Sequence, residues 1–228
     1  MASRIHGGEC AKTRTISSLR LTQPRVPIGN MDYFLRLRET MIRYAITNRF
    51  LFSGGETARR EGLVRQAARL SADGVDYLQV REKDLSSEDL EALVRSLLKA
   101  ARGAGRLKLL VNREIGVARS SGADGIHVPA GWSGGGGGLP LRSVGCHSVA
   151  EVGTAARSGA GLILFSPVFG KSLDGTEVVA GVGLAALGRA VEAAGAVPVL
   201  ALGGVTAQNA HACVQAGAGG VAGIRLFA

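Results

Sequence analysis

From Met41 onward, short apolar runs alternate with longer stretches in which apolar residues recur at helical spacing. The stretches Glu56–Ala72 and Ser87–Ala101 place their leucines on one face, and Ser86 with the acids after it suits a helix start. This alternation predicts repeated βα units around a parallel sheet. Eight runs have the length and composition of strands: Arg43–Thr47, Tyr77–Arg81, Lys108–Asn112, Gly125–Val128, Ser143–His147, Leu162–Ser166, Val197–Leu202 and Gly220–Ile224.

Repeated glycine-containing segments indicate the same units. The segments that begin at Ser121, Ser158 and Ala216 each continue with Gly-Ala and reach Ile or Val at the sixth position. Each segment lies where a helix is expected to end and a strand to begin, and glycine favours a helix C-terminus. Eight such units in about 190 residues predict an α/β fold, a closed (β/α)8 TIM barrel of parallel strands, over an open doubly wound sheet.

Two connections depart from the ideal barrel. Five consecutive glycines, Gly134–Gly138, follow the fourth run, so we expect a flexible loop in place of a helix there. Only four residues follow the eighth run, so we expect the last helix to be missing or supplied by another element. The uncovered side of the barrel makes a homo-oligomer a possible assembly.

The segment 1–40 differs in composition from the rest of the chain. It holds seven Lys and Arg against three Asp and Glu and lacks periodicity. Three interpretations stay open: a disordered basic tail, a transit peptide, or a start assigned too early, with Met31 or Met41 as the true start. We therefore expect a tail over 1–40 and one barrel domain over 41–228.

The bulk composition narrows the class of protein. The net charge of +9 and the pI of about 10.2 suggest an anionic partner. The 41–228 segment has no basic run with interleaved aromatic residues, so we expect phosphorylated small molecules and no nucleic acid. Residues 193–224 carry no charge, but Pro198, polar side chains and glycines interrupt them, which argues against a membrane span. Three cysteines and no secretory signal favour the reducing cytoplasm.

Candidate chemistry lies at the carboxyl ends of the predicted strands, where barrels form their active sites. Gln79, Arg81 and Lys83 alternate along the second run, so they should point to one side and could bind a diphosphate or a carboxylate. The alternative is a solvated, charged strand end. Asn112 ends the third run beside them.

Two histidines lie on strands four and five. His147 at a strand end could be a general acid or base, or simply a packed residue. For His127 we expect a structural role. Cys146 precedes His147 directly, and neighbours in a strand face opposite ways, so a nucleophilic Cys–His pair is not expected.

Glycines follow the seventh strand in the form Gly203-Gly204, and we expect a helix to start near Thr206. Paired glycines can form a nest of backbone N–H donors, and many barrels bind phosphate in the loops after strands seven and eight. Ile224 and Arg225 follow the eighth strand and should complete this site. The alternative is an ordinary glycine turn.

Taken together, these motifs resemble the thiamine phosphate synthases and their thiazole tautomerase relatives over about residues 44–226. The resemblance rests on six segments in the same order: Gln79–Lys83, Leu110–Asn112, Gly122–His127, His147–Ser148, Phe165–Phe169 and Ala201–Val205. It implies a barrel enzyme of thiamine biosynthesis that acts on a thiazole phosphate.

The resemblance also implies roles for single residues. Gln79, Arg81, Lys83 and Asn112 would contact the pyrimidine diphosphate of a synthase, and Lys171 would bind the diphosphate, although its surroundings match poorly. Gly204, Ile224 and Arg225 would bind the thiazole phosphate.

At the metal positions the chain departs from the synthases, which carry Mg²⁺-binding aspartates where Arg113 and Trp132 stand here. Neither side chain is a hard oxygen ligand. We therefore expect a tautomerase-like isomerase that needs no cofactor, with His147 moving the proton. A Mg²⁺-dependent thiamine phosphate synthase, and a non-catalytic binder of phosphorylated thiazole or thiamine phosphate, are the alternatives.

Overall fold

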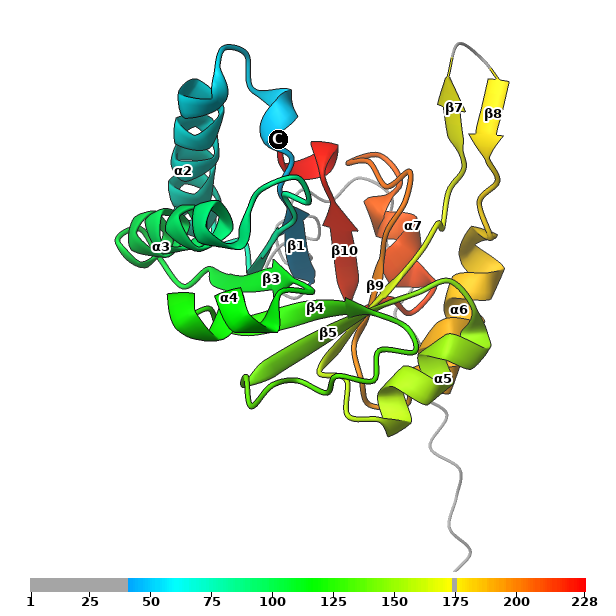
Figure 1. Cartoon of the computed structure of the whole chain (residues 1–228). Helices are drawn as coiled ribbons and strands as arrows, with labels where there is room; N and C mark the ends of the chain where they lie inside the picture. The colour runs from blue at the N-terminus through cyan, green and yellow to red at the C-terminus, as the bar shows by residue number, and fades with distance from the viewer. Residues whose placement is uncertain (1–40, 174–175) are drawn as a thin grey trace, which may run out of the picture.

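The computed structural model describes residues 41–173 and 176–228 (Figure 1). The segment 1–40, where we expect a tail, lies outside the described residues, and so do the side chains of residues 171–178. None of the helices in the described ranges combines the length and the apolar character that a membrane crossing requires.

Eight parallel strands close into a barrel in the order β1-β10-β9-β6-β5-β4-β3-β2. The predicted (β/α)8 topology is confirmed, and each strand differs from its predicted range by only one or two residues at either end. The barrel strands are β1 (Ile42–Ile46), β2 (Tyr77–Val80), β3 (Lys108–Asn112), β4 (Gly125–Pro129), β5 (Leu141–Cys146), β6 (Leu162–Phe165), β9 (Val199–Ala201) and β10 (Gly220–Gly223).

Helices cover the barrel on two sides, with α2, α3 and α4 on one and α5, α6 and α7 on the other (Figure 1). The helices are α2 (Glu56–Ala72), α3 (Ser87–Arg102), α4 (Ile115–Ser121), α5 (Val149–Arg157), α6 (Gly183–Ala194) and α7 (Ala210–Gln215), with the 3-10 turns η1 (Arg49–Leu51) and η2 (Arg225–Phe227). The predicted start of α3 is confirmed, because the Ser86 side chain accepts a hydrogen bond from the Asp89 N–H.

Two features lie outside the simple repeat. β4 runs into β5 through turns at Gly134–Gly138 without a helix, as predicted, and η2 follows β10 in place of a last helix. The hairpin of β7 (Lys171–Leu173) and β8 (Thr176–Val179), which the apolar pattern does not predict, stands away from the barrel between β6 and α6 (Figure 1).

Side chains alternate between two cores along the strands. The barrel interior holds a small cluster that includes Tyr44, Leu110 and Leu164. Ala45 follows Tyr44 and Ile163 precedes Leu164, and both pack outward against the helices. The period of two follows from the pleat of a strand. The carboxyl ends of all eight strands therefore open on one face, where the polar residues gather.

Candidate active site

A cavity of about 330 Å³ opens at the carboxyl ends of the barrel strands. Every barrel strand, or the residue just after it, contributes to its wall, so residues that are far apart in sequence meet here. The lining residues are Ile46, Gln79, Arg81, Lys83, Asn112, Arg113, His127, Pro129, Gly145, His147, Leu164, Ser166, Leu202 and Ile224. The predicted convergence of the strand-two, strand-three and strand-five residues is thus present in the fold.

A chain of side-chain hydrogen bonds crosses the barrel beneath this cavity. Gln79 Nε2 donates to Asn112 Oδ1 at 3.0 Å, and the Tyr44 hydroxyl lies 3.4 Å from Gln79 Oε1. The Tyr44 hydroxyl is also 3.1 Å from Ser143 Oγ, which is 2.8 Å from His127 Nδ1. Burial raises the pKa of Tyr44 far above its usual value, so the phenol stays neutral. This network holds Asn112 and His127 in fixed orientations at the floor of the cavity.

His127 is held in its neutral form. Burial is the largest cause, and the positive charges of Arg81 and Arg113 add to it, so the pKa falls to about 4. The expected structural role of His127 agrees with its hydrogen bond to Ser143, yet its ring also lines the cavity. A cation-lined cavity that keeps an imidazole neutral is a site suited to anions.

The segment that carries Arg81 and Lys83 is fixed by a buried arginine. Arg49 contacts Glu82 through both its backbone N–H and Nη1, at 3.2 and 3.0 Å, and forms a two-armed ion pair with Asp84. The Arg81 N–H donates to Thr47 Oγ1 at 2.9 Å. Because Glu82 and Asp84 flank Lys83, these contacts restrain the chain on both sides of the lysine.

His147 lies at the cavity rim and is exposed. Its Nδ1 is 2.8 Å from the Ser166 carbonyl oxygen, which can only accept, so Nδ1 donates this hydrogen bond, and Nε2 has no hydrogen-bond partner among the described residues. Cys146 faces the opposite way, into the outer core, and burial raises the pKa of its thiol to about 12. The geometry therefore excludes a Cys146–His147 nucleophilic pair, as predicted.

The Gly203-Gly204 turn leaves two backbone N–H groups unpaired. Both residues have positive φ angles, +91° and +64°, which favour glycine, and among the described residues neither backbone N–H has a hydrogen-bond acceptor, so both remain available to an anion. Phe169 N–H and Asn209 Nδ2 donate to the Gly203 and Gly204 carbonyls, at 3.0 Å each, and hold the turn in place.

The helix predicted to start near Thr206 is present as α7, but it starts four residues later. The Thr206 N–H donates to Asn209 Oδ1 at 2.8 Å and closes a turn, and α7 begins only at Ala210. The donors available to an anion are therefore those of the glycine turn and not a helix terminus. Ile224 lines the cavity wall, and Arg225 is exposed in η2 immediately after it.

Two other residues singled out in the sequence are not among those that line this cavity. Lys171 begins β7, and its side chain lies outside the described part of the structure. Trp132 borders a separate cavity between β4, β5 and α5, and its Nε1 donates to the Gly135 carbonyl at 3.1 Å.

The cavity does not fit a Mg²⁺ ion. Mg²⁺ takes hard oxygen ligands, chiefly carboxylates, but Arg49 already binds Glu82 and Asp84. No group of three or more His, Cys, Asp or Glu that could hold a metal occurs within residues 41–173 and 176–228. The three charged side chains that line the cavity, Arg81, Lys83 and Arg113, are all cations.

Sequence reasoning missed several residues of this site. Tyr44 and Ser143 are polar groups inside apolar runs, and that position is the signal that could have identified them. Arg49 gave no such signal, because its partners lie 7 to 35 residues away in the sequence. The resemblance drew attention to Arg113 only as a residue that cannot bind a metal, whereas in the fold Arg113 lines the cavity.

Comparison with known proteins identifies the family by sequence. A sequence model described as thiamine monophosphate synthase matches residues 44–133 and 141–227. A thiamine-phosphate synthase of Methanoculleus marisnigri is 37% identical over 182 residues, covering 73% of this chain and 81% of that protein. One from Roseiflexus castenholzii is 35% identical over 195 residues, covering 79% and 78%.

A solved structure agrees in fold. Thiamine phosphate pyrophosphorylase from Pyrococcus furiosus superposes with a TM-score of 0.66 at 24% identity, over 84% of this chain and 90% of that one. At this identity the likeness supports the barrel alone.

Proposed function

Because the chain belongs to the thiamine monophosphate synthase family, as its motifs predict, we propose that it catalyses the thiamine phosphate synthase reaction. In that reaction a pyrimidine diphosphate is joined to a thiazole phosphate and the diphosphate leaves. The observation that carries the proposal is a cavity with cations on one wall and, next to another wall, a turn whose backbone N–H groups are unpaired within the described residues. Arg81 and Lys83 line its wall after β2, and the Gly203-Gly204 turn follows Leu202 on the wall after β9. Two phosphorylated substrates need two such features.

The proposed residue roles follow from these positions. Gln79, Arg81, Lys83 and Asn112 would contact the pyrimidine diphosphate, and Lys171 would approach the diphosphate from β7. The N–H groups of Gly203 and Gly204, together with the backbone of Ile224 and Arg225, would hold the thiazole phosphate.

The relatives named as synthases support this reaction over the isomerase that the metal positions predict. A second candidate keeps one specific observation in its favour. His147 presents Nε2 without a hydrogen-bond partner at the cavity rim, and the cavity lacks a carboxylate cluster for Mg²⁺ within the described residues. A thiazole tautomerase would need only such a base, a phosphate site and a cation for the substrate carboxylate.

Two assays on one preparation test these reactions. The first supplies the pyrimidine diphosphate and the thiazole phosphate, once with Mg²⁺ and once with EDTA, and measures thiamine phosphate. The second supplies the thiazole carboxylate phosphate tautomer in EDTA and follows its aromatisation. Thiamine phosphate in the first assay supports the synthase, and aromatisation alone supports the tautomerase. If neither assay gives product while the ligands still bind, both reactions are contradicted and the protein is a binder of these phosphates. A cytoplasmic location and a homo-oligomer stay predictions of the sequence.

A further inference from the structure

We propose that Arg113 is a direct anion ligand, and that Arg81, Lys83 and Arg113 together bind a diphosphate or carboxylate group of the substrate without a metal ion. In this arrangement the Arg113 guanidinium supplies the charge neutralisation that a metal ion would otherwise supply. The identity of the substrate rests on the proposed function.

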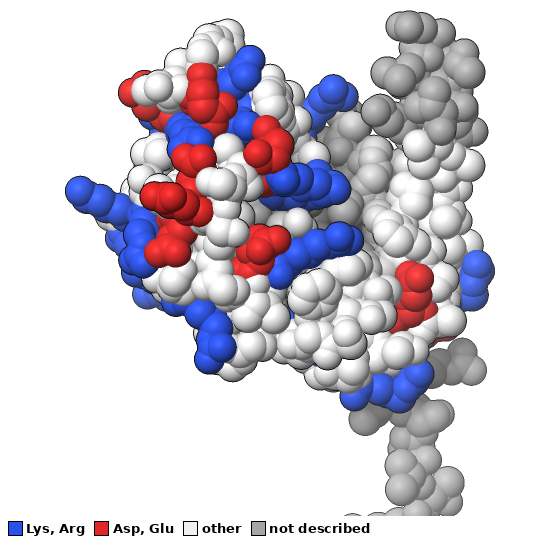
Figure 2. Space-filling model, viewed as in Figure 1, with Lys and Arg blue, Asp and Glu red and all other residues white. Residues whose placement is uncertain are grey.

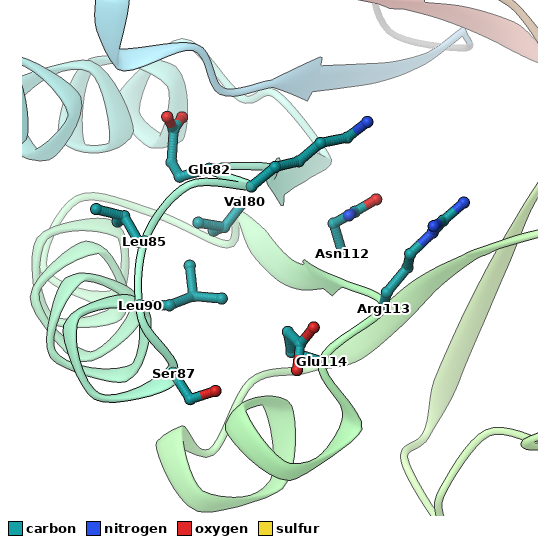
Figure 3. A pocket seen from close by; sticks show the side chains of 9 residues that line it. Val80, Glu82, Leu85, Ser87, Leu90, Asn112, Arg113 and Glu114 are labelled. Carbon is teal, nitrogen blue, oxygen red and sulfur yellow. The ribbon is translucent and has the colours of Figure 1, made fainter.

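The three cations come from neighbouring strand ends and share one cavity. Arg81 and Lys83 follow β2, and Arg113 follows β3, which pairs with β2 in parallel register. Figure 3 shows the Arg113 side chain extending from the end of β3 away from α3, whereas Glu114 turns to the other side. Arg113 and Glu114 line one neighbouring cavity, but no ion pair joins them.

No acid in the described part of the chain pairs with these cations. Every recorded ion pair there involves Arg49, Arg60, Arg65, Arg69 or Arg95 instead. On the face shown in Figure 2, Lys and Arg side chains extend over the central hollow, and most Asp and Glu lie to one side of it, some of them at its edge. The effect reaches the floor of the cavity, where Arg81 and Arg113 help to lower the pKa of His127. The electrostatic repulsion among three like charges around one cavity decreases when an anion binds there.

The backbone of Arg113 adds an independent observation. Its φ is +64°, and it is the one non-glycine residue with positive φ among the described residues. The turn is fixed on both sides, because the Arg113 N–H donates to the His127 carbonyl at 2.9 Å and the Ile115 N–H donates to the Arg113 carbonyl at 3.0 Å. A glycine would adopt this conformation without the steric cost that a side chain incurs. An arginine at such a position is best explained by what its guanidinium binds.

Binding of inorganic pyrophosphate in EDTA, measured by calorimetry, tests the site. We expect the wild-type chain to bind, Arg113→Gln to weaken binding by about tenfold or more, and Arg113→Lys to retain part of it. Arg119→Gln is the matched control, because it removes the same charge from an exposed position in α4 and should change binding by less than about twofold. Binding that appears only with Mg²⁺, or equal binding by Arg113→Gln and wild type, would overturn the proposal.

A folding defect is separated from a binding defect by Arg113→Gly. Glycine suits the positive φ, so the midpoint of thermal unfolding should stay near the wild-type value while pyrophosphate binding is lost. NMR titration of the His127 ring gives a second readout. Its pKa should rise in Arg113→Gln, and in the wild type on addition of pyrophosphate, but not in Arg119→Gln. An unmoved His127 pKa in both of the first two cases counts against the site.

The two anion sources are distinguished by comparing pyrophosphate with a non-phosphorylated thiazole carboxylate. The ligand that loses more affinity in Arg113→Gln identifies the group that occupies the site. The outcomes also separate the inference from the proposed reaction. Pyrophosphate binding that depends on Arg113, without turnover in either assay, would support the anion site and contradict the proposed reaction. Mg²⁺-dependent turnover that is equal in wild type and Arg113→Gln would support the reaction and contradict the anion site.

Discussion

Arg49 and Glu82 form an ion pair that is almost fully buried, with 3.0 Å between Nη1 and Oε2 and side-chain exposures of 5% and 2%. The same guanidinium reaches Glu56 and Asp84, so one arginine joins η1, α2 and the segment after β2. Its hydrogen bonds to these acids raise the pKa of Arg49 and lower the pKa of Asp84 to about 2. The segment that presents Lys83 to the cavity therefore depends on a charge that never contacts the cavity.

Replacing Arg49 by Met should destabilise the fold by about 3–5 kcal/mol, because Glu82 is left buried without a partner. Urea unfolding monitored by circular dichroism measures the change. Arg65→Met is the control, because its pair with Glu61 is exposed and should contribute about 0–1 kcal/mol. Equal losses of unfolding free energy in the two variants would show that the buried pair contributes no more to stability than the exposed one.

Stability should fall as the pH drops from about 6.5 to about 4, through the titration of His127. The folded-state pKa is lowered to about 4, so in this window the unfolded chain binds more protons, and acid favours unfolding. A shift of that size corresponds to roughly 3 kcal/mol. The test compares urea unfolding of the wild type and His127→Gln at pH 7 and pH 4.5. The difference in free energy of unfolding between the wild type and His127→Gln should change with pH. An equal difference at both pH values would contradict the lowered pKa of His127.

Gly204→Ala should destabilise the chain and weaken phosphate binding together. A Cβ atom at this position would lie 2.7 Å from Phe169 Cβ and 2.9 Å from the Gly170 carbonyl oxygen, in addition to the cost of a positive φ. We expect a loss of about 2 kcal/mol or more, measured by thermal unfolding. Gly122→Ala is the control, since it has φ +74° and open space around the added atom, and it should lose only about 1 kcal/mol.

His147→Ala should lower turnover by about 100-fold or more in the tautomerase assay, if the proton passes through Nε2. Substrate affinity and the unfolding midpoint should stay near wild type, because the ring is exposed and its recorded contacts are with Ser166 alone. Turnover and the dissociation constant are measured on the same preparation. Unchanged turnover in both the synthase and the tautomerase assays would remove His147 from the chemistry.

The sequence by itself determined the barrel and the edge of the barrel on which the site lies. Strand and helix periods are local properties, so eight apolar runs and their amphipathic partners could be placed from the chain alone. Alternation along β2 and its extension was enough to put Gln79, Arg81 and Lys83 on one side, and a parallel topology was enough to bring Asn112 beside them. The αL glycine at Gly122 followed from the same local reasoning.

Only the tertiary structure decided which distant groups meet. The Tyr44–Ser143 contact spans 99 residues, and the Arg49 ion pairs join acids before and after β2. The start of α7 was missed because the Asn209 side chain takes the Thr206 N–H and delays the helix. The closed barrel also places Arg113 in the wall of the cavity, whereas in the sequence it is only a residue that cannot bind a metal. Such contacts depend on the register and closure of the whole sheet, and periodicity along one segment carries no information about either.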